Sequence, residues 1–525
     1  MSKRVGIASL IWASTILLSR IIGLVREAVL GRTLGAGPEA DVYHAAFIIP
    51  DWLNYLLAGG ALSIVFIPIF ADYLAKEQEE RGWQAFSEIA NFLVVLMLAV
   101  MTGLWLGMPA IVDLVFPKFD PSQRAELVAL TRIVLPAQLF HVLGGLLSAS
   151  LQARDRHALP AIAPLLYTGS IVAGGLIGGT EAGAYGFAWG VLVGSVLGPF
   201  GLPLIGCVKS GLRWRPRLSL RSPDLRTYLW RSLPIMLAFS VVAVDEWIFK
   251  VLAQGMDTGS VAITQYARNL MKVPIGVFGL AIGTATFPTL TRLMALDQRD
   301  EAHATLTQAV QRILVLALGA QVILTVAGPE ISRVIYGGRM SAAQHETLGL
   351  TLAIMCLGLW AWAIQSMLAR GFYAMGKTWL PSLLGTGIVL ACLPLYVSLG
   401  NLAQTRGLAG AGAVAISLYV LALAFLLRRE FPGLRSGYLG FSLRVGPALA
   451  GGIAAGWFGG GALALSGRLG LDGALAALVD GGIKGALGGL VYLGLAIALK
   501  VPGLDELLAK LTGKLRAKLG RKPAA

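Results

Sequence analysis

Charged residues are scarce in this chain of 525 residues, in which Asp, Glu, Lys and Arg make up 14% and hydrophobic residues 56%. Soluble proteins carry about 25% charged residues, so the composition excludes an ordinary soluble domain. Cysteine is almost absent, and Cys207, Cys356 and Cys392 lack C-x-x-C spacing, which excludes a disulfide framework or a cysteine-bound metal. The five histidines are scattered, and no H-E-x-x-H, triad-bearing G-x-S-x-G or phosphate-binding glycine loop occurs. We therefore expect no enzymatic activity and no metal or cofactor.

Long apolar runs take the place of charge, and they are continuous rather than alternating in polarity. This pattern predicts membrane-spanning helices and not the strands of a barrel. Runs of the about 20 residues that cross a bilayer fall near 6–33, 41–73, 86–107, 125–152, 158–178, 184–207, 229–253, 260–293, 304–327, 346–375, 379–399, 407–427, 441–465 and 476–499. The predicted fold is an all-α polytopic membrane protein with about 14 transmembrane helices. Pro50, Pro68, Pro274 and Pro288 interrupt the second and eighth runs, where we expect hinges.

Basic residues give the chain a formal net charge of +15, and they lie between the apolar runs. This placement indicates membrane orientation and argues against a nucleic-acid partner. Alternate loops are basic, such as the segment from Lys209 to Arg231, whereas the loops between them contain few Lys or Arg. The positive-inside rule then places both termini in the cytoplasm. The basic amphipathic tail, 501–525, is expected to lie on the anionic inner leaflet.

The two halves of the chain repeat at a nearly constant offset. L-Q-A-R-D-R-H-A-L-P (151–160) and F-Y-A-M-G-K-T-W-L-P (372–381) share their alanine, a basic residue, leucine and proline, 221 residues apart. Pro50 pairs with Pro274 and Pro68 with Pro288, at offsets of 224 and 220. Chance recurrence of Pro and Gly is the alternative. A six-helix unit duplicated in parallel predicts two lobes that rock around a central site. The predicted parts are the N-lobe 1–207, a basic linker 208–228, the C-lobe 229–430, two extra helices in 431–500 and the tail.

Three charged residues lie inside the first apolar run. Arg20 and Glu27 are seven residues apart, hence nearly on one helix face, and Arg26 lies about a third of a turn away. A charge at hydrocarbon depth is costly, so such residues usually face a watery cavity or a partner. The guanidinium group suits a phosphate because it offers paired donors. These arginines therefore predict an anion-binding cavity, with snorkelling to the interface as the alternative.

The seventh and eighth runs carry a second set of charges. Glu246 and Lys250 have the i,i+4 order of an intrahelical pair, which leaves Asp245 as a candidate for ion or proton coupling. Arg268 and Lys272 lie on one face just before Pro274, where a helix break favours a cavity; snorkelling is the alternative. Asp41 and His44, by contrast, are placed where capping or interfacial residues commonly occur.

A series of motifs resembles a known family. The stretch 19–70 contains S-R-I-I-G-L-V-R-E, G-A-G-P-E-A-D-V-Y-H-A-A-F-I-I-P and A-G-G-A-L-S-I-V-F-I-P-I-F. Q-A-R-D-R-H-A-L-P-A-I-A-P (152–164), Y-A-R-N-L-M-K-V-P-I-G-V-F-G-L-A-I-G-T-A-T-F-P (266–288) and R-G-F-Y-A-M-G-K-T (370–378) follow. In this order they resemble the MurJ/MviN family of bacterial lipid II flippases, part of the multidrug/oligosaccharidyl-lipid/polysaccharide exporter superfamily. The resemblance covers most of residues 1–430.

The resemblance implies a V-shaped, alternating-access bundle in the bacterial inner membrane, with a cationic cavity for the head of undecaprenyl-pyrophosphate-linked lipid II. Arg20 and Arg26 match the family's cavity arginines, Glu27 its adjacent acid and Asp41 the acid that opens the second helix. Other implied partners are membrane lipids and proteins of cell-wall synthesis or division.

This sequence departs from the family pattern at three places. Asn54 and Tyr55 stand where an arginine is common, Gly59 replaces a glutamate, and Asn269 occupies the usual arginine position beside Arg268. The substrate-binding candidates are nevertheless Arg20, Arg26, Glu27, Asp41, Arg268 and Lys272.

The favoured hypothesis is a flippase for the peptidoglycan precursor lipid II, with Arg20, Arg26 and Arg268 on the diphosphate. Because no nucleotide site is visible, we expect the membrane potential or a coupling cation, Na⁺ or H⁺, to supply the energy. One alternative is a flippase for another polyprenyl-linked glycan. A drug/cation antiporter would favour cavity carboxylates, and a membrane-embedded polyprenyl transferase would favour acidic clusters or metal ligands on loops.

Overall fold

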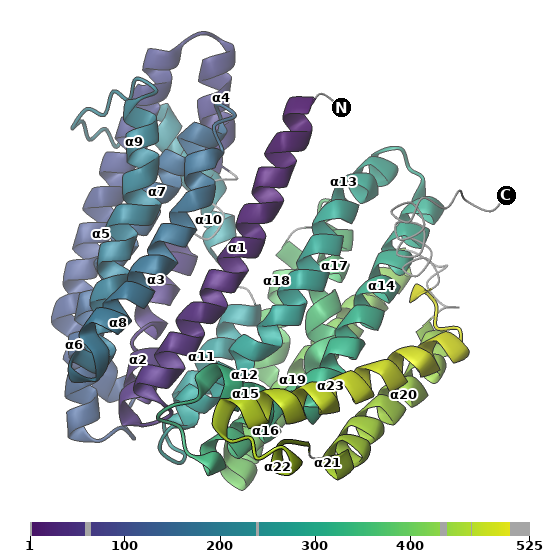
Figure 1. Ribbon diagram of the computed structural model, residues 1–525. Coiled ribbons are helices and arrows are strands. Elements are labelled where there is room, and N and C mark those ends of the chain that lie inside the picture. Colours follow the sequence, from purple (N-terminus) through teal and green to yellow (C-terminus); the bar gives the residue numbers. More distant parts are fainter. Residues whose placement is uncertain are drawn as a thin grey trace. The chain divides into compact units, whose positions relative to one another are not determined.

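The computed structural model describes residues 3–57, 65–237, 241–377, 379–430, 438–463 and 465–504. Within these ranges the backbone alone is described at 3–17, 20, 56–57, 234–237, 241–242, 280–281, 438–439 and 468. Helices and their connecting turns make up the described residues, which contain no strand (Figure 1). The all-α prediction is therefore confirmed.

The chain forms two compact units. The N-terminal unit comprises Met1–Phe239 with Asp257–Ala262 and Gly338–Met340, and the C-terminal unit comprises Ser240–Met256, Ile263–Gly337 and Ser341–Ala525. The helices that begin in the N-terminal unit are α1 (Lys3–Leu34), α2 (Pro38–Ala45), α3 (Ile48–Leu57), α4 (Ile67–Ala75), α5 (Glu79–Val115), α6 (Pro121–Val134), α7 (Ala137–Gln152), α8 (Ala158–Ser195), η2 (Val196–Gly201), α9 (Leu202–Val208) and α10 (Pro223–Leu237).

The remaining helices belong mainly to the C-terminal unit, although the first three residues of α12 cluster with the N-terminal unit. These helices are α11 (Val241–Ala253), α12 (Ser260–Pro274), η3 (Ile275–Leu280), α13 (Ala281–Ala295), α14 (Arg299–Val326), α15 (Gly328–Tyr336), α16 (Ala342–Met355), η4 (Cys356–Gly358), α17 (Leu359–Ala374), α18 (Trp379–Ala391), α19 (Leu393–Glu430), α20 (Tyr438–Ala454), η6 (Ala455–Gly459), α21 (Gly460–Leu463), α22 (Leu465–Arg468) and α23 (Gly473–Ala498).

Within the described residues, eight helical segments are long and apolar enough to cross a membrane, and α12 with α13 makes a ninth if the 41° bend between them lies within one span. Two of the long helices contain breaks in the backbone. Gly179 and Gly183 interrupt α8 with φ of +53° and +47°, and Ala403 and Gln404 leave the helical region inside α19. Both breaks lie where the apolar pattern predicts a loop. The count of 14 spans stays a prediction.

Glycine sets the packing of α8 in the N-terminal unit. The limb before the break lies against the limb after it, and a Cβ added at Gly174 would lie 2.4 Å from the carbonyl oxygen of Gly186. Small residues permit this approach of two backbones. The helix α1 packs along α8 in turn (Figure 1). The charged helix α1 therefore packs against the two closely apposed halves of α8.

In the C-terminal unit, α14 is central, with α13, α16, α17, α20 and α23 packed against it. Figure 1 shows α20 and α23, drawn in yellow-green and yellow, beside α14. The helix α19 packs against α11, α16 and α17 on another side of the same unit. This arrangement brings residues of α11, α12 and α19 together, although they lie far apart in the sequence.

Candidate functional site

The charged pair of α1 is partly accessible. The Arg26 guanidinium donates through Nη2 and Nε to Glu27 Oε1, at 2.5 and 3.1 Å. The Arg26 side chain is 34% exposed, whereas that of Glu27 is 8% exposed. Among the described residues two of the five guanidinium donors are used in these bonds, which leaves donors of Arg26 for a further anion. The Arg20 side chain lies outside the described residues, and its part in the site stays a prediction.

The short helix α2 uses two carboxylates to bind backbone N–H groups. Asp41 is 4% exposed and accepts bonds from the N–H groups of Gly259 and Ala262, at 2.7 and 2.8 Å. These N–H groups lie at the start of α12, where a helix leaves its first donors unsatisfied and favours a negative charge. Asp41 is thus a cap for α12, whereas the sequence analysis considered capping at the start of the helix that carries it. Contact of Asp41 with a substrate stays a prediction.

Glu39 has a similar role that the sequence analysis missed. Its Oε1 accepts a bond of 2.8 Å from the Ala184 N–H at the break of α8. The positive φ of Gly183 favours glycine there, and a Cβ at this position would lie 1.7 Å from this oxygen and displace the Glu39 carboxylate. The only sequence signal was an acid in the first turn of a helix that begins with proline.

The second charged site is a buried pair in the C-terminal unit. Arg268 Nη1 donates to Asp245 Oδ2 at 2.6 Å, and both side chains are 3% exposed. The Tyr396 hydroxyl also donates to Asp245, and the Arg268 guanidinium lies 4.3 Å from the ring centroid of Phe249. Asp245 looked unpartnered in the sequence, yet the fold supplies it with a cation and a hydroxyl group.

Glu246 organises the neighbouring charges. Its carboxylate lies 3.7 Å from Lys250 Nζ, so the predicted i,i+4 pair is confirmed. It also accepts a bond of 2.7 Å from Lys272, whose side chain is 38% exposed. Gln265 lies between this carboxylate and Asn269, donating to the latter at 3.1 Å. Lys272 is the most accessible cation of this group, and Arg268 the least accessible.

The four predicted hinge prolines lie in two kinds of position. Pro50 and Pro68 lie in the first turns of α3 and α4, where a missing N–H does not break a helix. Pro274 ends α12 and is followed by the π-helical segment η3, and Pro288 lies inside α13. The 41° bend between α12 and α13 follows Pro274. Hinge motion at any of the four stays a prediction.

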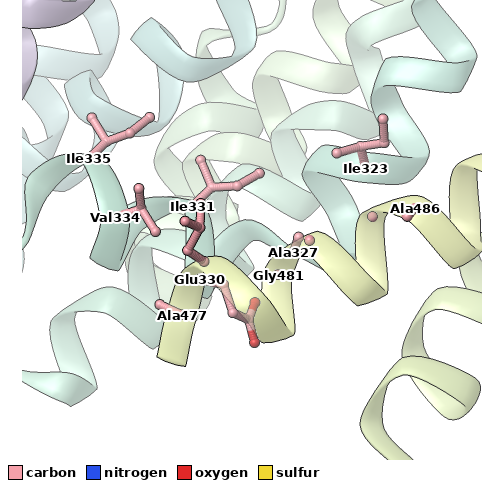
Figure 2. Close-up of a pocket in the computed structure, with 12 residues that line it drawn as sticks. Ile323, Ala327, Glu330, Ile331, Val334, Ile335, Ala477, Gly481 and Ala486 are labelled. Atoms are coloured by element: carbon pink, nitrogen blue, oxygen red, sulfur yellow. The ribbon is translucent and has the colours of Figure 1, made fainter. Parts of the chain in front are cut away.

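A pocket of about 410 Å³ opens between α14, α15 and α23 in the C-terminal unit (Figure 2). Glu330, which is 7% exposed, contributes to its wall and accepts a bond of 2.6 Å from Lys484. The other lining residues are aliphatic or glycine: Ile323, Ala327, Ile331, Val334, Ile335, Ala477, Leu478, Gly481, Gly482, Gly485 and Ala486. Such walls suit a hydrocarbon group. The sequence analysis missed this pocket, whose signal was the closely spaced glycines of α23.

Comparison with known proteins first defines the class. The chain matches the solved structure of the lipid II flippase MurJ in an inward closed conformation with a TM-score of 0.74 and 21% identity, over 94% of this chain and 99% of that one. It matches an inward-facing multidrug resistance transporter of the MATE family, described as part of the MOP superfamily, with a TM-score of 0.65 and 14% identity, over 82% of this chain and 99% of that one. The chain therefore has the multi-helix membrane-protein fold that these two structures share.

Sequence comparison then defines the family. A family model described as "Lipid II flippase MurJ" matches residues 30–459. A probable lipid II flippase MurJ of Rhizobium tropici is 29% identical over 422 residues, which cover 78% of this chain and 79% of the relative. The lipid II flippase MurJ of Burkholderia cenocepacia is 29% identical over 384 residues, 71% of this chain and 74% of the relative. The chain belongs to the MurJ family.

Proposed function

We propose that this protein is a lipid II flippase, which moves the undecaprenyl-pyrophosphate-linked peptidoglycan precursor from the inner to the outer leaflet of a bacterial cytoplasmic membrane by alternating access. Membership of the MurJ family over residues 30–459 is the observation that carries the proposal. The apolar helices place the protein in a bilayer. The family membership supports the inner membrane as its location, and the alternation of basic loops supports the cytoplasmic side for both termini.

The accessible guanidinium of Arg26 is the proposed first contact for the diphosphate. It already binds one carboxylate oxygen through two donors, and a phosphate oxygen offers the same kind of acceptor with more charge. Because Glu27 is itself an anion, it holds Arg26 in position and competes with the substrate at the same time. Arg20 would add a second guanidinium from the face of α1 that carries Glu27, about a third of a turn from Arg26.

Arg268 enters the proposed cycle only by leaving Asp245. In the buried pair its Nη1 is bound to Asp245, and the ring of Phe249 covers the guanidinium. Transfer of Arg268 to the diphosphate would release the Asp245 carboxylate, which could then bind Na⁺ or H⁺. Each entering charge contributes about 2.3 kcal/mol per 100 mV of membrane potential. On this proposal Asp245 couples cation binding to substrate binding.

The test is growth of a lipid II flippase-depleted strain together with a leaflet-accessibility assay for labelled lipid II. Arg26→Ala is expected to abolish both at a normal protein level, whereas Arg429→Ala, an exposed arginine over Phe425 at the end of α19, leaves both intact. Asp245→Asn is expected to remove the dependence of transport on the cation gradient. Growth and lipid II transport that persist in the Arg26→Ala variant would contradict the proposed role of Arg26 in binding the diphosphate.

A flippase for a different polyprenyl-linked glycan is the second candidate. The observation in its favour is that Asn54 and Asn269 stand where the resemblance expects arginines. Both candidates predict the same diphosphate chemistry, and they differ in the sugar. Transport of another undecaprenyl-diphosphate glycan in place of lipid II, measured in the same assay, would favour the second candidate.

A further inference from the structure

Arg370, in α17, differs from the cations of the charged sites described above. Arg26, Lys272 and Lys484 each bind a carboxylate, and so does the fully buried Arg268. Arg370 lies within a candidate membrane span, is only partly exposed and has no carboxylate within 4.0 Å among the described residues. A guanidinium in a membrane span is costly unless it has a partner or reaches the interface.

The Arg370 guanidinium lies against the backbone of α13. A Cβ added at Gly283 would lie 2.1 Å from Arg370 Nη1 and 3.0 Å from its Cζ, so the head group occupies the space that a side chain would fill. Nη1 is buried there and has no hydrogen-bond acceptor among the residues that the structure describes. A buried donor without an acceptor loses its hydration and gains nothing in return. The guanidinium is therefore held in place without being neutralised.

The same place is the break of a membrane span. The segment η3 between α12 and α13 is π-helical, and the two helices differ in direction by 41°. Both η3 and α13 pack against α17, the helix that carries Arg370. Backbone irregularity at membrane depth is tolerated where it lines a cavity or binding site, and π-helical turns are frequent at functional sites.

The end of α17 offers a simpler explanation that covers only part of the geometry. Arg370 lies four residues before Ala374, where the helix ends, and a cation is favoured near the C-terminus of a helix. That effect requires only a positive charge near the last turn. It does not account for a head group that is packed onto Gly283 with one nitrogen buried and unbonded.

We infer that Arg370, seated on Gly283 at the break between α12 and α13, is a binding site for a phosphate ester. The guanidinium supplies charge and a fork of donors matched to phosphate oxygens. The ester belongs either to the diphosphate of a polyprenyl lipid or to the headgroup of an anionic phospholipid. The first source rests on the proposed flippase function, and the second stands without it.

The test is titration of the purified full chain in nanodiscs with undecaprenyl diphosphate and, separately, with phosphatidylglycerol against phosphatidylcholine. Arg370→Gln is expected to weaken binding of one of the two phosphate lipids about tenfold, since a charge-assisted hydrogen bond is lost. Arg370→Lys keeps the charge but loses the paired donors of the guanidinium, so its affinity is expected to lie between those of wild type and Arg370→Gln. Gly283→Ala displaces the guanidinium while keeping its charge, and should weaken binding as well. Arg429→Gln is the control and should change nothing.

The two arms separate the outcomes. Weaker binding of undecaprenyl diphosphate alone assigns the site to the transported lipid class, and weaker binding of phosphatidylglycerol alone assigns it to a membrane lipid. Equal affinity of wild type, Arg370→Gln and Gly283→Ala for both lipids overturns the inference. If the wild type binds phosphatidylglycerol through Arg370 but neither binds undecaprenyl diphosphate nor transports lipid II, the proposed function fails and the site stands. A thermal unfolding curve for each variant excludes loss of folding as the cause.

Discussion

Two arginine–carboxylate pairs with nearly equal bonds differ in their surroundings. The Arg26–Glu27 pair of α1 has a contact of 2.5 Å and side chains that are 34% and 8% exposed. The Arg268–Asp245 pair of the C-terminal unit has a contact of 2.6 Å, with both side chains 3% exposed. The comparison teaches that accessibility, not bond length, decides which arginine can exchange its carboxylate for a phosphate. An accessible pair contributes little to stability, whereas breaking a buried pair leaves an uncompensated charge.

Breaking the buried pair is the first way to test this comparison, and it has the largest expected effect. Arg268→Ala leaves the Asp245 carboxylate without its cation and is expected to lower the free energy of unfolding by about 3–5 kcal/mol. Thermal and denaturant unfolding in detergent would measure the loss. The double variant Arg268→Gln with Asp245→Asn removes both charges and should recover part of it. If Arg268→Ala lowered the free energy of unfolding by less than about 1 kcal/mol, the buried and the accessible pair would contribute equally to stability.

Asp41 sharpens the comparison because it is buried but binds backbone N–H groups instead of a cation. Asp41→Ala leaves the N–H groups of Gly259 and Ala262 without their acceptor. The expected loss is that of a helix cap, about 0.5–2 kcal/mol. Asp41→Asn keeps one acceptor oxygen and should cost less. A loss as large as that of Arg268→Ala would indicate that burial alone, and not an unpaired charge, sets the effect.

Glu27 tests the accessible side of the comparison. Glu27→Gln removes the charge that faces Arg26 and keeps the size of the side chain, so the unfolding free energy should change by only about 0–1 kcal/mol. Binding of a diphosphate lipid, measured by titration, should become tighter because its competitor for the guanidinium is weakened. Glu27→Gln at twice the salt concentration is a useful control, since screening should reduce the gain. Destabilisation comparable to that of Arg268→Ala would contradict the assignment of Arg26 as the exchangeable arginine.

The features that could be predicted from the sequence are those set by local spacing. The i,i+4 pair of Glu246 and Lys250, the break at Gly179 and Gly183, and the bend after Pro274 all depend on residues a few positions apart. The all-α fold followed from continuous apolar runs for the same reason. Local rules of helix geometry are enough for such features.

The features that could not be predicted depend on residues distant in the chain. Asp245 is bound by Arg268, 23 residues away, and by Tyr396, 151 residues away. No periodicity within one helix carries that information, so Asp245 looked free. The pocket at Glu330 and Lys484 joins residues 154 positions apart and was missed for the same reason. Which charges neutralise one another is a property of tertiary packing.

Asp120 is a fully exposed carboxylate and extends the comparison from buried to exposed groups. Its substitution has the smallest expected effect on stability. It caps α6 by accepting a bond of 2.8 Å from the Gln123 N–H, while the Gln123 side chain bonds back to the Asp120 N–H at 3.1 Å. The hydrogen bond from Gln123, followed by that from the Ser122 hydroxyl, holds the pKa of the Asp120 carboxyl below its usual value. A folded-state pKa below the unfolded value means that the charged cap stabilises the fold at neutral pH.

That stabilisation is present above the unfolded pKa of about 3.9 and is lost as the pH falls through the lower, folded pKa. Asp120→Asn keeps a cap acceptor but cannot titrate, so the difference in unfolding free energy between wild type and variant should be constant from pH 7 to 5 and shrink below pH about 4. Denaturant unfolding of both proteins across this range measures it. Because the site is exposed, added salt should reduce the difference as well. A difference in unfolding free energy that grows on acidification would mean that folding raises the Asp120 pKa. The exposed fraction of a carboxylate would then fail to predict the size of its contribution to stability.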